Sequence, residues 1–256
     1  MNEQRIGYSE INSNFVAKAS KKLGSDWNST LLLGHAFTHI NRTNLSTTGT
    51  QSVVPNMESI KYYTVYTSTS SPSKKNIIGV FADLKFDYKS QLFFSLTGRN
   101  DWSSTLPAEN RSFFYPSASV AYVFTELPFL KDNSVLSFGK FRASYAEVGK
   151  DADPYQIGVY YNTLQAFNGV SGINRSTTIG SENLKPERTK GIEFGGVFRF
   201  FEDRITLDAN YAIANSIDQI VPVPVSYASG YDVFVTNAGE IRNNSIELML
   251  NANIIN

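Results

Sequence analysis

The chain has 256 residues, 41% of them hydrophobic and 13% aromatic, and its 23 basic and 23 acidic side chains give a formal net charge of zero. This balance provides no electrostatic argument for a nucleic-acid partner or an anionic membrane surface. The absence of cysteine excludes disulfides, thiolate metal sites and cysteine nucleophiles. No apolar run of about 18 residues predicts a membrane-spanning helix, and the opening residues MNEQRIGYSE do not resemble a signal peptide.

Alternation of apolar and polar residues along much of the chain predicts β-strands. Between Val80 and Tyr88 the apolar side chains stand on even positions, with Asp83, Lys85 and Asp87 between them. Similar patterns recur in segments rich in Tyr, Phe, Val and Thr, which favour strands. In chain order, the predicted strands are 11–22, 27–37, 77–88, 90–101, 115–126, 135–147, 186–200, 204–217 and 240–254.

The connections between these strands alternate between short and long. The short ones read LGSD, KS, LPFLKDNS and FED, and the long ones are 38–76, 102–114, 148–185 and 218–238. A further hairpin element is expected inside the first long connection, at SIKYYTVYTSTS. Soluble domains seldom contain repeated long loops, whereas outer-membrane barrels combine short periplasmic turns with long extracellular loops.

Two architectures use such strands differently. A soluble β-sandwich buries the apolar residues between two sheets, whereas a wide membrane barrel turns them toward lipid and lines its lumen with polar residues. The predicted strands reach or exceed the roughly 9–11 residues of a membrane strand, against a mean of about 5–6 in soluble proteins. Aromatic residues near strand ends, at Trp27, Trp102, 113–115 and 200–201, are typical of interfacial girdles. The sequence therefore predicts an all-β fold, an antiparallel transmembrane β-barrel.

Four blocks resemble the barrel of SusC/RagA-type TonB-dependent outer-membrane receptors. They read LTGRNDWSSTLPAENRSFFYPSASVAYVFTEL, GKFRASYAEVGKD, ENLKPERTKGIEFGGVFRFFEDRITLDANYA and NAGEIRNNSIELML, and Ser245 stands where the family usually has Gly. The resemblance covers residues 75 to 256, and the first 75 residues are less similar. The matching positions in the first two blocks are Arg99, Asp101, Ser103, Ser104, Tyr115, Pro116, Ser117, Glu126, Lys140, Arg142, Ser144, Tyr145 and Gly149.

The resemblance implies a 22-stranded receptor barrel in the outer membrane of a Gram-negative cell, closed by a plug and paired with a SusD-like lipoprotein. Such receptors import oligosaccharides or peptides with energy passed through TonB, and they need no cofactor. This chain shows no signal sequence, TonB box or plug, and its end LNANIIN lacks a terminal aromatic residue. We therefore expect residues 1–256 to be one partial barrel domain from the middle of a receptor, without its plug and C-terminal strands.

The long connections contain the candidate substrate-binding residues. Aromatic faces stack on sugars, and arginine clamps carboxylates. In the alternative interpretation, these rings pack the loops against each other or form the outer girdle. The principal candidates are Trp102, Arg111, Tyr155, Tyr160 and Tyr161, with Phe167, Tyr227 and Tyr231 beside them.

Charged residues on the polar side of the strands suggest a wetted lumen wall with ion pairs between neighbouring strands. Contact with a plug or a passing substrate is the alternative for some of them. The residues concerned are Asp83, Lys85, Asp87, Arg99, Asp101, Arg142, Glu193, Arg199, Arg204, Asp208 and Glu247.

Metal binding and catalysis find little support in the sequence. On a strand, His35 and His39 would lie roughly 13 Å apart, beyond joint reach of one ion, and GKDADPY is interpreted as a solvated turn in preference to a calcium loop. No Gly-x-Ser-x-Gly nucleophile motif is present, so no catalytic residue and no metal are expected. A soluble or surface-attached glycan-binding β-sandwich and a catalytic outer-membrane barrel are the alternative functions.

Overall fold

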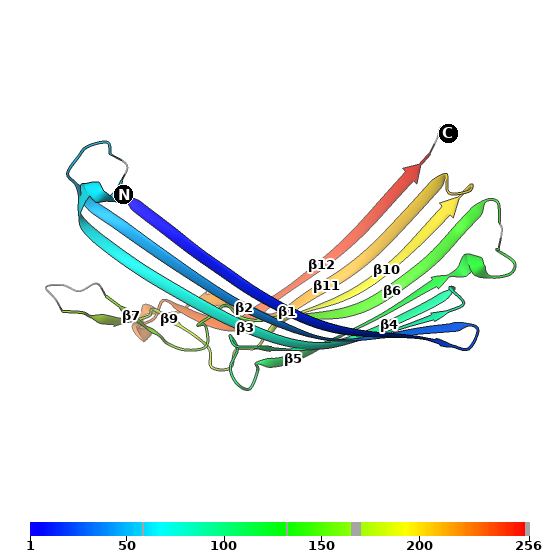
Figure 1. Cartoon of the computed structure of the whole chain (residues 1–256), viewed down its shortest axis with the longest axis horizontal. Coiled ribbons are helices and arrows are strands. Elements are labelled where there is room, and N and C mark those ends of the chain that lie inside the picture. Colours follow the sequence, from blue (N-terminus) through cyan, green and yellow to red (C-terminus); the bar gives the residue numbers. More distant parts are fainter. Residues whose placement is uncertain (58, 132, 165–169, 254–256) are drawn as a thin grey trace.

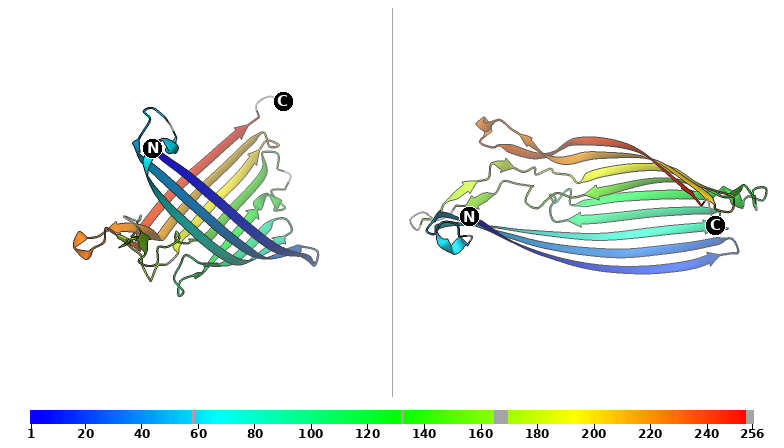
Figure 2. Two further views of the ribbon diagram at one scale, coloured as in Figure 1. Left: turned by 60° about the vertical axis from the view of Figure 1, so that its left-hand side comes forward. Right: turned by 90° about the horizontal axis from the view of Figure 1, so that it is seen from above.

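The computed structural model describes residues 1–57, 59–131, 133–164 and 170–253. Within these ranges the chain forms one long, curved, single-layered antiparallel sheet (Figure 1). The ten strands of this sheet follow the order β1-β2-β3-β4-β5-β6-β10-β11-β12-β9, and β7 and β8 form a separate hairpin. Sequential strands are thus neighbours in space, as in an up-and-down barrel, and the sheet is an open section of such a barrel (Figure 2).

The nine predicted strands correspond to β1–β6 and β10–β12, except that 124–126 form η2 and not the end of a strand, and that residue 254 of the last predicted strand lies outside the described residues. All neighbouring pairs are antiparallel except β12 and β9, which pair in parallel. Short 3-10 helices η1 (Ile60–Tyr62), η2 (Phe124–Glu126) and η3 (Tyr227–Ser229) lie in connections. The strands are β1 (Asn2–Leu23), β2 (Trp27–Ser52), β3 (Tyr63–Tyr88), β4 (Leu92–Ser103), β5 (Ser112–Val123), β6 (Leu136–Lys150), β7 (Tyr161–Thr163), β8 (Ile173–Arg175), β9 (Thr178–Ile179), β10 (Glu187–Phe200), β11 (Ile205–Pro224) and β12 (Val233–Ala252).

The register collects the alternating residues into two faces. Leu84 is opposite Leu96 and Phe86 is opposite Phe94, whereas Lys85 is opposite Ser95. Directly opposed residues share a face of the sheet, so an apolar face and a polar face continue from strand to strand. Exposed members of the apolar face from β1 to β12 are Phe15, Leu31, Leu33, Phe94, Leu96, Phe141, Ile192, Phe194, Tyr211, Ile246 and Leu248.

No second sheet covers the apolar face in the described part of the chain. Leu96, in the middle of β4, is 54% exposed, and Phe194 on β10 is 56% exposed. A sandwich would bury these side chains between two layers, so the structure does not support the β-sandwich alternative. No helix in the described ranges is long and apolar enough to cross a membrane.

Three of the short connections, LGSD, KS and FED, are tight turns at one end of the sheet. The prediction of a short connection at LPFLKDNS is wrong, because it lies in the connection 124–135, which contains η2 and is longer than 104–111. Gly24 in the β1–β2 turn has φ 80°, and Lys89 and Ser90 in the β3–β4 turn have φ 51° and 54°. The backbone N–H of Ser90 donates to Asp87 Oδ1 at 2.8 Å, which offsets the strained turn. Lys89 Nζ lies 3.3 Å from Asp26 Oδ2 in the neighbouring turn, and the hydrogen bond to this carboxylate raises the pKa of Lys89 above its ordinary value. The two turns are therefore tied together.

The prediction of long loops at 38–76 and 218–238 is wrong over most of their length. β2 runs to Ser52, β3 begins at Tyr63, β11 runs to Pro224 and β12 begins at Val233. The expected hairpin element at SIKYYTVYTSTS is found, as η1 and the beginning of β3. The other two long connections shorten to 104–111 and 151–186, and β7, β8 and β9 lie within the latter.

Cross-strand pairs of small polar residues explain these strand extensions. Thr47 Oγ1 lies 3.0 Å from Ser68 Oγ across the β2–β3 pair. Gln4 Nε2 donates to Asn44 Oδ1 at 2.9 Å across the β1–β2 pair. Such pairs stabilise a sheet without requiring an apolar face, so this part of the hairpin carries no apolar alternation to predict it. We call the part of β2 and β3 beyond the last β3–β4 pair, residues 39–76, the extended hairpin.

Candidate functional site

On the polar face of the sheet, an ion pair joins β6 to β11 across the strand between them. Arg142 on β6 donates from Nη2 to Asp208 Oδ1 on β11 at 2.9 Å and from Nη1 to Oδ2 at 3.4 Å. β10 lies between them, and its Gly195 is opposite both Arg142 and Asn210. A Cβ atom at Gly195 would lie 2.5 Å from Arg142 Nε. The guanidinium can cross β10 because residue 195 has no side chain.

A second polar group lies near the long-loop ends of β4 and β5. Arg99 Nε donates to Asp101 Oδ1 at 2.8 Å, and the Tyr115 hydroxyl donates to the same carboxylate. Asp101 is 6% exposed. Gly79 on β3 provides the space, because a Cβ atom there would lie 2.3 Å from Asp101 Oδ1. Arg99, Asp101 and Tyr115 are thus bound to one another, which gives these matching positions a structural role.

A third polar group binds the beginning of the segment 151–186. Asp151 Oδ1 accepts from Lys75 Nζ on β3 at 2.5 Å. Its Oδ2 accepts from the Ser103 hydroxyl and from Thr105 Oγ1, the latter at 3.3 Å. The Asp151 side chain is 8% exposed. The prediction of a solvated turn is therefore wrong for Asp151, whereas Asp153 is exposed.

A small apolar cluster lies beside these polar groups. Leu106, Phe113, Ala152, Leu184 and Val235 are buried together, with Leu184 fully inaccessible to solvent. These residues come from the connection 104–111, from β5, from both ends of the segment 151–186 and from β12. The long-loop end of the sheet is thus a packed structure around its own core.

Trp102 lies on the apolar face of the sheet, although its backbone is close to that of Arg111. Trp102 is opposite Ile78 and Ser112, on the same face of the sheet as Leu96, and is 38% exposed. The girdle interpretation requires a position on the apolar face. Arg111 is exposed at the end of the connection 104–111, and its carbonyl oxygen accepts from Ser103 N at 3.0 Å.

The three tyrosines of the segment 151–186 lie close together in the sequence, and two of them are in contact. Tyr155 and Tyr160 form an edge-to-face pair with ring centroids 5.7 Å apart. Tyr161 begins β7, is opposite Arg175 on β8 and is 66% exposed. Phe167 lies outside the described residues. Exposed rings on a packed base provide stacking surfaces for a ligand.

Arg175 is a residue that the sequence interpretation missed. Its guanidinium lies 4.1 Å from the Tyr231 ring centroid and donates from Nη2 to the Gly230 carbonyl at 2.8 Å. The segment 151–186 is thereby joined to the connection 225–232, in which Tyr227 is 81% exposed. No sequence spacing relates Arg175 to Tyr231, because they come from different connections.

Ion pairs in the described part of the chain lie partly between strands and partly within them. Arg142–Asp208, Lys150–Glu187 and Arg188–Glu147 join different strands. Lys85–Asp83 lies within β3, Arg99–Asp101 lies within β4, and Arg199 pairs with Asp203 in the following turn. The prediction of ion pairs between neighbouring strands is therefore wrong for this second group. It is also wrong for Arg142–Asp208, because β10 lies between β6 and β11. The two pairs that join the neighbouring strands β6 and β10 are formed by residues outside the predicted set.

His35 and His39 lie on the apolar face of β2, on the same parity as Leu33. His35 is opposite Val80, and His39 is opposite Asn76. His39 Nδ1 is 2.6 Å from Asn76 Oδ1 and shares a hydrogen bond with it.

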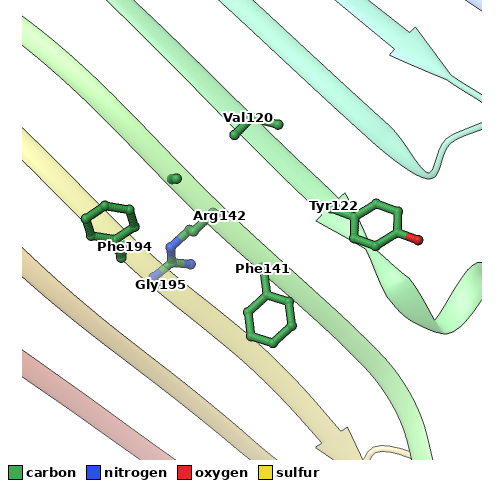
Figure 3. Close-up of a pocket in the computed structure, with 7 residues that line it drawn as sticks. Val120, Tyr122, Phe141, Arg142, Phe194 and Gly195 are labelled. Atoms are coloured by element: carbon green, nitrogen blue, oxygen red, sulfur yellow. The ribbon is translucent and has the colours of Figure 1, made fainter.

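A shallow hollow lies on the apolar face between β5, β6 and β10. It is lined by Val120, Tyr122, Phe141, Arg142, Ala143, Phe194 and Gly195 (Figure 3). The hollow is open and mostly apolar, and the guanidinium of Arg142 beside it is bound to Asp208. It therefore provides no set of converging polar groups that would fix a specific ligand.

The single curved sheet, with one apolar face and one polar face, is an open section of a wide β-barrel of the outer-membrane type. Residues 3–254 match the family model for the TonB dependent receptor-like β-barrel. The chain therefore belongs to the TonB-dependent receptor β-barrel family, and the recognition and fold class predicted from the sequence are confirmed.

Similar proteins include several receptors and their solved structures. TonB-dependent receptor P3 of Formosa agariphila is 29% identical over 216 residues, which are 81% of this chain and 22% of the relative. TonB-dependent receptor SusC of Bacteroides thetaiotaomicron is 27% identical over 72% of this chain and 19% of the relative. The structure of the RagAB peptide transporter matches with a TM-score of 0.85 at 18% identity, over 99% of this chain and 29% of the other. This chain thus spans about a fifth of the length of the curated relatives.

Proposed function

We propose that residues 1–256 form the middle part of the barrel of an outer-membrane nutrient receptor of the SusC/RagA type. The continuous, exposed apolar face backed by a polar face is the observation that supports this most strongly. Lipid would cover the apolar face, because exposing an apolar surface of this extent to water is unfavourable. The polar face would line the lumen of the complete barrel, in the outer membrane of a Gram-negative cell.

The complete receptor would take up oligosaccharides or peptides with energy from TonB and with a SusD-like lipoprotein as its partner. This proposal rests on the family and on the similarity to SusC and to the RagAB peptide transporter. The chain itself would supply wall and loops, with no catalytic residue and no cofactor.

Within the chain, the segment 151–186 and the connection 104–111 are the proposed ligand-contacting parts. Arg111, Tyr155, Tyr160 and Tyr161 remain the candidate substrate-binding residues, since they are exposed at the long-loop end. Trp102 shares the apolar face with Leu96. We assign it to the membrane-interface girdle, where an indole ring lies at headgroup depth.

Spin labels on β4 test the orientation of the two faces. In a complete receptor in lipid vesicles, single cysteines would replace Phe94, Ser95, Leu96 and Thr97 in turn. Labels at 94 and 96 should be accessible to lipid-soluble oxygen, and labels at 95 and 97 to a water-soluble nickel chelate. Equal accessibility at all four positions, or the reverse order, would contradict the proposed membrane orientation.

Uptake itself is tested by deleting the receptor gene. Cells lacking the receptor should lose growth on one class of nutrient, oligosaccharide or peptide, and regain it when the receptor is restored. Unchanged growth on both classes would refute the uptake function while leaving the barrel orientation untouched.

A further inference from the structure

The segment 151–186 is fixed at its beginning by one buried carboxylate. We propose that Asp151 is a positioning residue, which locks this segment onto β3 and β4 and thereby sets where its exposed tyrosines stand. The inference deepens the proposed function and rests on it, because the segment carries three of the candidate ligand contacts.

Both oxygens of the Asp151 carboxylate accept hydrogen bonds from other parts of the chain. Lys75 Nζ binds Oδ1, while the hydroxyls of Ser103 and Thr105 bind Oδ2. Ser103 is itself 2% exposed and Thr105 is 4% exposed. A buried carboxylate with a cation and two hydroxyl donors is held in one position, because any departure leaves charged groups without partners.

This lock joins parts of the sheet that are not neighbours. Asp151 follows β6, whereas Ser103 ends β4 and Lys75 lies on β3. β5 lies between β4 and β6 in the sheet. Lys75 also lies just beyond the last β3–β4 pair, Ile77 with Ser103. The segment is therefore bound to β3 and β4 across β5, and not only to β6 from which it emerges.

The base of the segment is closed by further contacts. Ala152 and Leu184 are buried in the same apolar cluster. Near the base, Ser181 N donates to the Gln156 carbonyl at 3.2 Å, and Gly180 N donates to the Gly158 carbonyl at 3.2 Å. Tyr155 and Tyr160 flank this closed part, so a shift at Asp151 is passed directly to both rings.

The lock can be measured in a complete receptor that carries residues 1–256 and has no other cysteine. Spin labels at Asn162→Cys on β7 and Glu109→Cys in the connection 104–111 report the distance between the segment and the rim. Four variants are compared with the parent: Asp151→Asn, Lys75→Met, the double variant, and Asp153→Asn as a matched control. Asp153→Asn removes the same charge from an exposed position two residues further on.

The parent should give one narrow distance distribution in lipid vesicles. Asp151→Asn and Lys75→Met should each lose that narrow peak, and the double variant should be no broader than either single one, because all three remove the same ion pair. Asp153→Asn should match the parent. A narrow, unshifted peak in Asp151→Asn, equal broadening in Asp153→Asn, or additive broadening in the double variant would overturn the proposal.

Heat-modifiable electrophoretic mobility shows whether each variant still forms a barrel. Only folded variants enter the distance comparison. If Asp151→Asn does not fold, Lys75→Met alone, compared with Asp153→Asn, decides between the same outcomes. A parent receptor that forms no barrel would instead refute the proposed function, so the two failures are distinct.

Discussion

Gly195 and Gly191 lie on the same polar face of β10, but their surroundings differ. A Cβ atom at Gly195 would meet the Arg142 guanidinium at 2.5 Å, whereas at Gly191 the nearest atom is the Ala146 carbonyl oxygen at 3.8 Å. We therefore predict that Gly195→Ala displaces Arg142 from Asp208 and lowers the free energy of unfolding by about 1–3 kcal/mol, as overpacking does. Urea unfolding of the receptor in lipid vesicles measures this change.

Gly191→Ala is the matched control for this prediction. Its new methyl group meets ordinary van der Waals contact, so the free energy of unfolding should change by less than about 0.5 kcal/mol. Equal losses at the two glycines would show that strand flexibility, and not the path of Arg142, requires glycine at position 195.

Tyr115 gives a second prediction at the scale of single residues. Tyr115→Phe removes the hydroxyl that donates to Asp101 and leaves the Arg99–Asp101 ion pair in place. Since hydrogen bonds to charged groups contribute about 1.5–3 kcal/mol, we expect a loss of that order in urea unfolding. Tyr122→Phe is the control, because Tyr122 on the same strand lies on the apolar face. A loss at Tyr122 as large as that at Tyr115 would contradict the assigned role.

The extended hairpin yields a prediction at the scale of elements. Thr43 is opposite Pro72, so deleting residues 44–71 and closing the ends with a short turn removes only the outer part of β2 and β3. Among the described residues, that part pairs with β1 in addition to its own two strands. We expect the shortened receptor to assemble in the outer membrane in normal amounts, as judged by heat-modifiable mobility. Loss of the folded band would show that the extension is needed for assembly.

The strands between the short turns were predictable, but their extensions were not. Where strands cross the proposed membrane, one face must be apolar, so alternation such as Leu84, Lys85 and Phe86 carries the signal. Beyond the proposed membrane, neither face of the strands is covered by lipid or by a protein core. Thr47 and Ser68 then pair through hydroxyl groups, and no periodicity reveals them.

The site was less predictable than the fold for a related reason. Asp151 has the local neighbours of a turn, and its partners Lys75 and Ser103 come from other strands. Arg175 and Tyr231 meet only because two connections pack together. Such contacts depend on the three-dimensional approach of distant segments, which residue spacing does not encode.

At the scale of the whole molecule, the open edges of the sheet decide how the isolated chain behaves. β1 pairs with β2 on one side only, and its residues are exposed throughout. Unpaired strand edges associate with other chains, and they are excluded from lipid unless a barrel closes. We predict that residues 1–256 alone aggregate in buffer and become β-rich and dispersed only in detergent, measured by circular dichroism and sedimentation. Cooperative unfolding of a monomer in buffer would contradict this.

The extended hairpin also changes what the cell presents to its surroundings. At about 3.3 Å per residue, residues 63–76 of β3 add roughly 45 Å beyond the last pair with β4, more than the ~30 Å hydrocarbon thickness of a bilayer. In the proposed orientation this hairpin projects from the outer surface of the cell. An antibody, a phage or another large particle would meet its tip before it met the lumen. Asn56 in that tip is exposed, so a short peptide tag inserted there would be accessible to a binding reagent outside the cell.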